Sequence, residues 1–460
     1  MSFTAVQPVT PLSRKRGFGW ADVIGPIGIA LVASTVFLWI FDHGLTILSD
    51  FPPSLGSIGL LTGLLSSILM ILQVLLLARI PWVERAWGHD LLAHRHRWLG
   101  FWSLWLMIVH VVAFAIVGWR HDPSAPGEAL INLFIRRPWM LWATVGTVLI
   151  IVVVVTSIRC ARARLRYESW HLLHLYAYLG MAFALPHQII GSADFHTTVA
   201  QVYWWSLYSL TLAVTILFRL LLPIYRTIRY RLRVVSVTNE GPQVVSVAME
   251  GRHLEQLNPK SGQFFIWRFL DGPGWTRGNP YTLSDARDGN RLRVTIQASG
   301  EGSARVANLK PGTAVAIEGP YGTMTVDRRV HDHLLFMAAG VGITPLRALI
   351  AETTFAPGEA ILIYRYTSHE HAIFVRELQW FTAERGLRVV YLAGSRRTDG
   401  SWLPTGYAGS DDEVLQELVP NISEHDVFVC GPPAWVRSVK RAARRAGAAR
   451  HQIHSEDFAW

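Results

Sequence analysis

The run of residues that decides the fold is 94–119, which reads HRHRWLGFWSLWLMIVHVVAFAIVGW. A transmembrane helix needs about 20 mostly apolar residues, and the part from Trp98 to Trp119 has that length. Its one ionisable side chain is His110, and His94 and His96 come just before it. Ionisable side chains inside a membrane are costly and usually functional. The stretch therefore predicts a membrane-spanning helix whose histidines have a chemical role.

Further stretches of the chain are also long and apolar enough to span a bilayer. They are Ala21–Phe41, Ile58–Leu77, Trp139–Ile158, Trp170–Ile190 and Val202–Leu222. Tryptophans at the ends of several stretches are typical of an aromatic belt at the membrane surface. The sequence therefore predicts a short tail, residues 1–20, followed by a six-helix transmembrane bundle, residues 21–225.

The basic residues of the chain mark the ends of its apolar runs. A net charge of +10 could indicate nucleic-acid binding, but the arginines and lysines form no single patch, which argues against that class. They lie mainly at residues 14–16, in the second and fourth connections, and after the sixth span. The positive-inside rule then predicts a multi-pass protein of the plasma (inner) membrane with cytoplasmic termini. Two cysteines, Cys160 and Cys430, exclude a disulfide framework and a thiolate zinc cluster.

The histidines of the third and fifth spans fall at matched depths. His96 and His110 are 14 residues apart. On a helix this spacing is a rise of about 21 Å, and the two side chains point in directions about 40° apart. His174 and His187 rise by about 19–20 Å, although a straight helix would place them about 140° apart. Pro186 is expected to distort the helix there. We therefore pair His96 with His174 and His110 with His187.

Two imidazoles at each iron would make a six-coordinate haem, which is suited to electron transfer. The histidines could instead form a proton relay in a multi-pass transporter or channel with a regulatory nucleotide-binding domain. A haem subunit that serves an external partner is a third interpretation. The absorption spectrum of the purified protein would distinguish a haem protein from a transporter.

Residues 58–190 resemble the membrane domain of ferric reductases and NADPH oxidases. The resemblance rests on the entry motif at residues 96–100, His-Arg-Trp-Leu-Gly, with a second histidine 14 positions on. It also rests on Tyr-Glu-x-Trp-x-x-x-His at residues 167–174, with a last histidine 13 positions on. The resemblance implies that two b-type haems are ligated by His96, His110, His174 and His187.

From Tyr230 onward the pattern is that of a soluble protein. Short alternating strands separated by Gly/Pro turns predict a small antiparallel barrel over residues 226–328. After Gly322 the order becomes strand, helix, strand, which predicts a parallel α/β domain over residues 329–460. The expected strands are Arg233–Val237, Gln243–Ala248, Phe264–Arg268, Arg291–Gln297, Ala314–Glu318, His333–Ala338, Ala360–Tyr364, Arg388–Gly394 and Asp426–Val429.

Three segments of residues 230–460 resemble the ferredoxin–NADP reductase superfamily. The first is Asn279-Pro280-Tyr281-Thr282-Leu283-Ser284. The resemblance implies that this segment binds FAD, with Tyr281 against the flavin ring and a hydroxyl of Thr282 or Ser284 near the reactive nitrogen. The family usually has Arg or His where Asn279 stands. Arg277 or Arg305 is therefore expected to supply the charge for the FAD pyrophosphate.

The second segment is residues 300–305, Gly-Glu-Gly-Ser-Ala-Arg, followed by a predicted short helix to Leu309. Ser303 is a good N-cap residue, and the free amides at a helix start suit a phosphate. We expect Gly302, Ser303 and Arg305 to contribute to the FAD site.

The third segment follows the apolar strand His333–Ala338 and precedes a helix from Leu346. It contains the nucleotide-binding candidates Gly340, Gly342, Thr344 and Pro345. Glycines at a strand-to-helix turn let the backbone approach a pyrophosphate at the helix N-terminus. Strand and helix on either side are the context that this motif requires.

The end of the chain completes the resemblance. Cys430, Gly431 and Pro432 follow a strand and would border the nicotinamide. The acidic-aromatic terminus includes Glu456, Phe458 and Trp460, and Trp460 would cover the flavin until nicotinamide displaces it. Tyr281, Thr282, Ser284, Cys430 and Trp460 are the expected catalytic residues.

Arginines follow two successive strands of the predicted α/β domain, at Arg365 and at Arg396–Arg397. Charged donors suit the 2′-phosphate of NADPH, so these residues favour NADPH, with NADH possible. The order of the parts predicts electron flow from NAD(P)H through FAD and two haems to an external acceptor. The acceptor stays open between dioxygen and chelated ferric iron.

Overall fold

The computed structural model describes residues 19–49, 55–121, 125–165, 167–191, 197–272, 277–286 and 288–456. Its contacts divide the chain into two compact units. The helical unit comprises Trp20–Val83 and Leu91–Arg219, and the strand-containing unit comprises Glu84–Asp90 with the residues from Leu220 onward. The basic residues 14–16, Arg166 of the basic fourth connection, and the terminal Phe458 and Trp460 lie outside the described residues.

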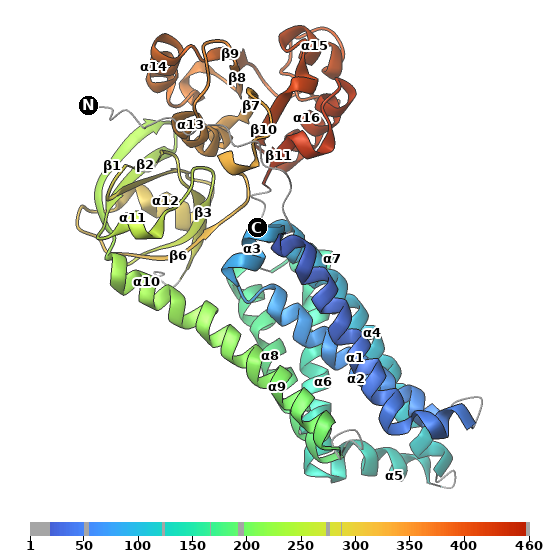
Figure 1. Ribbon diagram of the computed structural model, residues 1–460. Coiled ribbons are helices and arrows are strands. Elements are labelled where there is room, and N and C mark those ends of the chain that lie inside the picture. Colours follow the sequence, from blue (N-terminus) through green and yellow to red (C-terminus); the bar gives the residue numbers. More distant parts are fainter. Residues whose placement is uncertain are drawn as a thin grey trace. The chain divides into compact units, whose positions relative to one another are not determined.

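The helical unit is built from long helices (Figure 1). They are α1 (Trp20–Ser49), α2 (Leu55–Leu76), α4 (His89–His121), α6 (Pro138–Ser157), α8 (Tyr167–Gly191) and α9 (Thr198–Ile216). Shorter elements connect them: α3 (Pro81–Trp87), α5 (Pro126–Ile131), a π-helical turn (Asn132–Arg136) and α7 (Arg159–Arg162). A second π-helical turn, Leu217–Leu221, continues α9 into α10 (Leu222–Tyr230).

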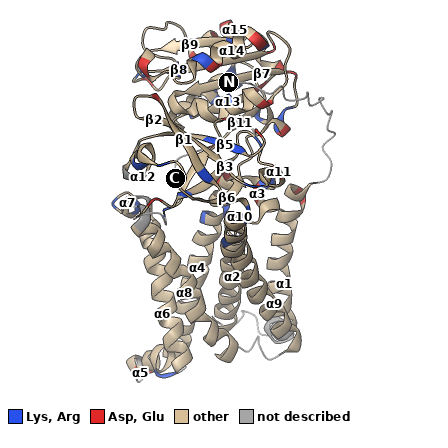
Figure 2. Cartoon of the chain, turned by 90° about the vertical axis from the view of Figure 1, so that its left-hand side faces the viewer, with Lys and Arg blue, Asp and Glu red and all other residues tan. Residues whose placement is uncertain are grey.

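Five helical stretches are long and apolar enough to cross a membrane, within the described part of the chain. They are Trp20–Phe41, Leu55–Leu76, His89–Arg120, Pro138–Ser157 and Thr198–Tyr230. All six expected spans lie in helices to within one residue, but α8, which holds the fifth, is not among these five. Its three histidines lower its apolar character. Figure 2 shows that Lys, Arg, Asp and Glu are sparse along the long helices and frequent in the other unit.

Small residues allow the long helices to pack closely. A Cβ atom on Gly146 of α6 would lie 2.5 Å from the Gly180 carbonyl oxygen of α8, and α6 and α8 make an extensive contact. Between α2 and α4, the Ser66 hydroxyl donates a hydrogen bond to the Ser103 carbonyl, at 2.8 Å. Large apolar side chains such as Phe41 and Leu172 point outward. The bundle thus has small residues and polar groups inside and large apolar side chains outside. This is the distribution expected of helices in lipid.

The first part of the strand-containing unit has two antiparallel three-stranded sheets, β1-β2-β5 and β4-β3-β6. The strands are β1 (Arg233–Gly241), β2 (Val244–Glu250), β3 (Phe264–Phe269), β4 (Asn279–Thr282), β5 (Arg291–Gln297) and β6 (Val315–Tyr321). A shared core, including Trp267 and Met249, fills the space between the sheets. Isolated bridges, Arg233 to Ala314 and Leu283 to Val294, join the sheets. These contacts do not make a single closed sheet among the described residues.

The second part is a five-stranded parallel sheet in the order β11-β10-β7-β8-β9, which confirms the predicted α/β domain. Its strands are β7 (His333–Ala339), β8 (Ala360–Tyr366), β9 (Arg388–Ala393), β10 (His425–Cys430) and β11 (Ile453–Ser455). Alternating residues of β7 enter two cores: one contains α13 (Ile343–Glu352) and α14 (Val375–Arg385), the other α15 (Asp411–Leu418) and α16 (Pro433–Arg445). Figure 1 shows these helix pairs on opposite faces.

Candidate functional site

The four predicted histidines form two facing pairs in the helical unit. The imidazole of His96 on α4 faces that of His174 on α8, with ring centroids 5.9 Å apart. His110 on α4 faces His187 on α8 in the same way, at 6.2 Å. The pairing chosen from helix rise is therefore the one that the structure contains. His94 and His171 belong to neither pair.

In each of the four rings, Nδ1 makes a hydrogen bond. His96 donates to the Gln73 carbonyl at 3.0 Å, His110 to the Gly59 carbonyl at 2.7 Å, and His187 to the Ala184 carbonyl. A carbonyl only accepts, so Nδ1 carries the proton in these three rings. Neutral histidine then has its lone pair on Nε2, the usual state of a metal-binding imidazole whose other nitrogen is hydrogen bonded.

The tautomer of His174 follows from its neighbours. Its Nδ1 lies 3.2 Å from the Ser157 hydroxyl. That hydroxyl uses its proton to donate to the Val153 carbonyl at 2.7 Å, and it accepts from the Trp170 indole N–H at 3.2 Å. Ser157 therefore has no proton to offer His174, and the Nδ1 of His174 must be the donor. All four rings present Nε2 as the free nitrogen.

The spacing of each pair fits a six-coordinate iron. A metal-bound imidazole nitrogen lies about 2 Å from the metal. Two rings on opposite sides of one iron then have centroids about 6 Å apart, which both pairs match. No cluster of three or more His, Cys, Asp or Glu side chains that could hold a metal ion occurs among the described residues. Two protein ligands suit a haem, because the porphyrin supplies the other four.

Sequence analysis did not predict how the rings of α8 reach α4. The calculation for a straight helix placed His174 and His187 on different faces, yet both face α4. The helix is continuous through Pro186. The Nδ1 of His187 bonds back to the Ala184 carbonyl, three residues earlier on the same helix. This bond fixes the direction of the ring and allows it to meet His110.

Two glycines of α2 lie beside His110 of the His110–His187 pair. A Cβ atom on Gly63 would lie 2.5 Å from Nδ1 of His110, and Gly59 supplies the carbonyl that this nitrogen bonds. The two glycines are four residues apart and therefore share one face of the helix. Sequence analysis missed them, although Gly-x-x-x-Gly in an apolar span is a recognised signal of close helix packing.

In the strand-containing unit, β4 places the predicted flavin residues at the edge of a sheet. Pro280 and Tyr281 pair with β3, and burial raises the pKa of the half-buried Tyr281 to about 12. Ser284 is fully buried and accepts a hydrogen bond from the Thr295 hydroxyl at 2.8 Å. The Ser284 hydroxyl thus faces the core between the sheets. Thr282, the other candidate, is also buried, with 7% of its surface exposed.

The residues expected to bind the FAD pyrophosphate line one small cavity of about 30 Å³. Asn279 and Gly302 lie there together with Arg277 and Arg305, the two arginines predicted to replace the family's usual charge. Arg305 also forms an ion pair with Asp271 at 3.0 Å. The structure therefore places these four residues around one cavity, and their role in binding FAD stays a prediction.

The expected N-cap role of Ser303 was wrong. Ser303 lies inside the short helix α12 (Glu301–Ala304) rather than before it. Its hydroxyl accepts hydrogen bonds from the Ser299 and Gly300 amides, at 2.9 and 3.1 Å. A serine hydroxyl can bond to backbone groups three or four residues earlier in the chain. Here it occupies amides that a bound phosphate would otherwise use. These two amides are consequently not free for a ligand.

The dinucleotide-binding candidates meet where the order of the parallel sheet reverses. The chain proceeds from β7 to β8 and β9 on one side, and β10 and β11 lie on the other. In such sheets, ligands bind beyond the carboxyl ends of the strands at this switch point. β7 ends at Gly340–Gly342, and its neighbour β10 ends at Cys430. Gly431 and Pro432 follow directly.

Close packing at the switch point requires Gly342. A Cβ atom there would lie 2.4 Å from the Cys430 carbonyl oxygen. Gly340 has φ of 56°, in the left-handed region that favours glycine. Thr344 and Pro345 begin α13, and the Thr344 hydroxyl donates to the Val341 carbonyl at 2.9 Å.

Two buried acidic groups lie beside the switch point, Cys430 and Glu456. Burial, together with the nearby Glu456, raises the pKa of the Cys430 thiol, so the thiol is neutral at physiological pH. Burial raises the pKa of the Glu456 carboxyl to about 8, and Asp90 and Glu84 add to this effect. Glu456 accepts a hydrogen bond from the Thr323 amide at 2.8 Å, whereas its second oxygen is buried without a partner among the described residues.

The three arginines predicted to bind a 2′-phosphate differ in their surroundings. Arg365 is the residue before the last of β8 and is buried, with no partner for its Nε among the described residues. Burial and then the charge of Arg396 lower the pKa of Arg365, so these two guanidinium groups are neighbours. Arg397 instead pairs with Asp399 and donates to the Tyr407 carbonyl at 3.2 Å. Of the three arginines, Arg365 and Arg396 are therefore the two whose positive charges lie close together.

A buried ion-pair network connects the two parts of this unit, and no sequence motif indicated it. Arg347 of α13 is almost fully buried and pairs with Asp285 and with Glu377 of α14. Arg293 of β5 also contacts Glu377, at 2.9 Å. Burial alone would raise the pKa of Glu377, but hydrogen bonds from Arg293 and the charge of Arg347 hold it below its usual range.

Family models match both halves of the chain. Residues 62–185 match the ferric reductase like transmembrane component, and residues 336–441 match the oxidoreductase NAD-binding domain. The helical unit thus resembles a ferric reductase-like membrane domain, and the parallel sheet of the other unit resembles an oxidoreductase NAD-binding domain.

The chain is similar to several curated reductases. It is 28% identical over 241 residues to ferredoxin–NADP reductase B of Sorangium cellulosum, covering 50% of the chain and 97% of the relative. It is 28% identical to the stachydrine N-demethylase reductase subunit of Rhizobium meliloti (49% and 66%) and 25% identical to the flavohemoprotein of Chromobacterium violaceum (49% and 59%). The chain thus spans about three fifths to two thirds of the length of these last two relatives.

Among solved structures, the FAD/NAD-binding domain of a nitric oxide dioxygenase from Vibrio cholerae has 22% sequence identity to this chain. The TM-score is 0.41, and the match covers 49% of this chain and 97% of that domain.

Proposed function

We propose that this protein is an oxidoreductase that carries electrons from cytosolic NAD(P)H, through FAD and two b-type haems, across the plasma membrane to an external acceptor. The observation that carries the proposal is the set of two facing histidine pairs, each about 6 Å between ring centroids and each with Nε2 free. When bound, FAD would supply hydride acceptance and the haems one-electron transfer. The protein supplies position, burial and charge.

In the proposed arrangement, His96 and His174 hold one haem and His110 and His187 hold the other. Apolar side chains occupy the layer between the pairs, including Met70, Met107 and Met181. These side chains exclude water from the interior of the bundle. The hydrogen bonds on Nδ1 orient each ring and make Nε2 a better donor to iron.

We assign residues 1–20 to a cytoplasmic tail and residues 21–225 to a six-span haem domain. The fifth span is α8, and its tight contact with the apolar helix α6 at Gly146 and Gly180 supports this assignment. Residues 226–328 would form a barrel that binds FAD, since bridges already join its two sheets. Residues 329–460 would bind NAD(P)H, with both termini in the cytoplasm.

Within the flavin and nicotinamide module, each proposed role follows from a position in the structure. Tyr281 would lie against the flavin and Thr282 would approach its reactive nitrogen, because the Ser284 hydroxyl is used in the core. Cys430 and Glu456 would border the nicotinamide as neutral groups. Arg365 and Arg396 would hold the 2′-phosphate and favour NADPH. Trp460 would cover the flavin.

The external acceptor is proposed to be dioxygen, which would give superoxide, or a ferric chelate. Superoxide dismutase-sensitive reduction of cytochrome c would identify the first, and formation of a ferrous chelate without oxygen would identify the second. Either acceptor would be a small molecule at the outer face of the bundle.

The proposed function is tested by the haem content of the purified full-length protein. The protein should contain two haems, and His110→Ala or His187→Ala should each remove about half of the reducible haem absorbance. His94→Ala and His171→Ala are matched controls, because they change histidines of the same two helices that belong to neither pair. Full haem content in both His110→Ala and His187→Ala would refute the assignment.

A further inference from the structure

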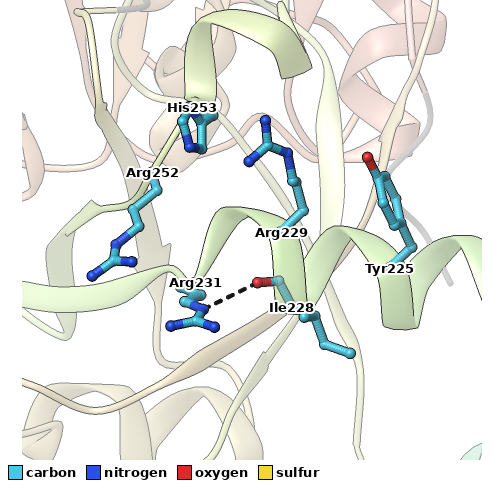
Figure 3. A pocket seen from close by; sticks show the side chains of 6 residues that line it. All are labelled: Tyr225, Ile228, Arg229, Arg231, Arg252 and His253. Carbon is cyan, nitrogen blue, oxygen red and sulfur yellow. Dashed lines mark hydrogen bonds between the residues drawn. The ribbon is translucent and has the colours of Figure 1, made fainter.

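A basic cavity of the strand-containing unit lies at the end of α10 (Figure 3). None of its lining residues is among those assigned to the flavin or the nicotinamide. Its volume is about 250 Å³. Its lining residues are Tyr225, Ile228, Arg229, Arg231, Arg252 and His253. We propose that this cavity binds the phosphate-containing headgroup of an anionic phospholipid.

Local backbone structure brings the arginines together. Arg231 ends α10 with a left-handed backbone, and its Nε donates to the Ile228 carbonyl at 3.3 Å. The turn after β2 packs against this helix end, because the Arg252 amide donates to the Tyr230 carbonyl at 2.7 Å. A Cβ atom on Gly251 would lie 2.7 Å from the same oxygen. Arg252 and His253 are therefore held against the end of α10 that carries Arg229 and Arg231.

The charges at this cavity favour an anion. None of the three arginines forms an ion pair with a carboxylate within the described part of the chain, and Arg229 bonds only the neutral Gln256 side chain, at 3.0 Å. The opposing charges are Glu255, which lies 3.6 Å from His253, and the helix C-terminus, which contributes about half a negative charge. Three guanidinium groups outweigh both. Guanidinium groups are well suited to phosphate oxygens.

The apolar neighbours of the cavity indicate that the phosphate comes from a lipid. The helix that runs through Thr198–Tyr230 is apolar enough to span a membrane, and α10 is its last part. Ile224 and Ile228 are exposed by 55% and 62%, one helix turn apart, and Tyr225 by 57%. A soluble anion would need none of this exposed apolar surface, whereas acyl chains would cover it.

The distances along the helix agree with a headgroup position. The headgroup layer on each side of a bilayer is roughly 5–8 Å thick. From Ile228, the last exposed apolar residue of α10, the chain rises about 5 Å to Arg231. The arginines would thus lie at phosphate level when Ile228 contacts the hydrocarbon. Basic clusters immediately beyond a transmembrane helix bind anionic lipids, with about 1 kcal/mol for each Lys or Arg.

The experiment measures binding of a fluorescent short-chain phosphatidylglycerol to the detergent-solubilised full-length protein by anisotropy. The matching phosphatidylcholine and inorganic phosphate are the other two ligands. Phosphatidylglycerol should bind more tightly than both. Arg229→Gln with Arg252→Gln should weaken it about 25-fold, since about fivefold per arginine corresponds to 1 kcal/mol each.

Arg388→Gln is the matched control, because Arg388 is an exposed arginine at the start of the edge strand β9. It should leave the affinity unchanged. Flavin reduction by NAD(P)H in detergent shows that each variant is folded, and it does not depend on the proposed lipid site. Equal affinity for the two lipids, equal affinity for inorganic phosphate, or no loss in the double variant would overturn the proposal. An equal loss in Arg388→Gln would also overturn it.

Discussion

Replacing Glu456 by Gln should change how the stability of the protein depends on pH. Burial raises the pKa of this carboxyl from 4.5 to about 8. The folded protein therefore keeps a proton that the unfolded chain releases above about pH 4.5. Stability from the protonated carboxyl is present at low pH and is lost as pH rises through about 8. Glutamine has the same shape and cannot ionise.

The size of the effect follows from the two pKa values. The interval from 4.5 to about 8, at about 1.4 kcal/mol for each pH unit, corresponds to about 5 kcal/mol when the change is complete. This is an upper limit, because water entering the site would solvate the carboxylate. For a unit of this size, about 1 kcal/mol lowers the thermal midpoint by about 2–4 °C. Relative to Glu456→Gln, the wild-type protein should lose roughly 10 °C between pH 5 and pH 9.

The assay follows release of FAD fluorescence on heating the full-length protein, at several pH values between 5 and 9. The Glu456→Gln variant keeps the acceptor oxygen for the Thr323 amide, so the two proteins should have similar midpoints at pH 5. Glu384→Gln, which changes an exposed carboxylate of α14, should retain the wild-type dependence on pH. Parallel curves for wild type and Glu456→Gln across the whole range would refute the reasoning.

Other substitutions test the remaining contacts. Gly63→Val should reduce haem absorbance by about half, because even a Cβ atom would lie 2.5 Å from Nδ1 of His110; full absorbance would contradict this. Glu377→Gln should lower the free energy of unfolding by about 1–3 kcal/mol, measured by thermal FAD release, because it weakens a largely buried ion-pair network. Arg396→Ala should lower kcat/KM for NADPH by about 10- to 150-fold and leave that for NADH unchanged, since a charged hydrogen bond contributes about 1.5–3 kcal/mol. Equal losses with both cofactors would indicate a damaged fold.

The parts of the structure that repeat a simple period could be predicted from sequence. Helix rise alone selected the partners of His96 and His110, because depth in a membrane depends only on the number of residues between two positions. The parallel sheet was equally clear, since its buried strands are continuous apolar runs. The histidine pairing and the parallel sheet each depend on a pattern that lies within a short stretch of sequence.

Features that depend on contacts distant in sequence could not be predicted. The four-residue strand β4 contains Pro280, which normally argues against a strand, and it forms only because β3 lies beside it. Ser303 resembled an N-cap, but the helix begins two residues earlier and the hydroxyl bonds back to preceding amides. The buried charge of Arg347 is explained only by Glu377 and Asp285, which lie on other elements.

The protonated Nδ1 atoms of the four paired histidines have a consequence for the energetics of the membrane. Nδ1 of each ring is bonded to a carbonyl or to Ser157. If Nε2 binds the iron of a haem as proposed, no nitrogen of these rings would be left to relay a proton. Electrons would then cross the bundle without protons, and each transfer would move one net charge. That charge costs or gains about 2.3 kcal/mol for every 100 mV of membrane potential. Turnover would therefore be sensitive to voltage, and a separate ion pathway would have to return the charge.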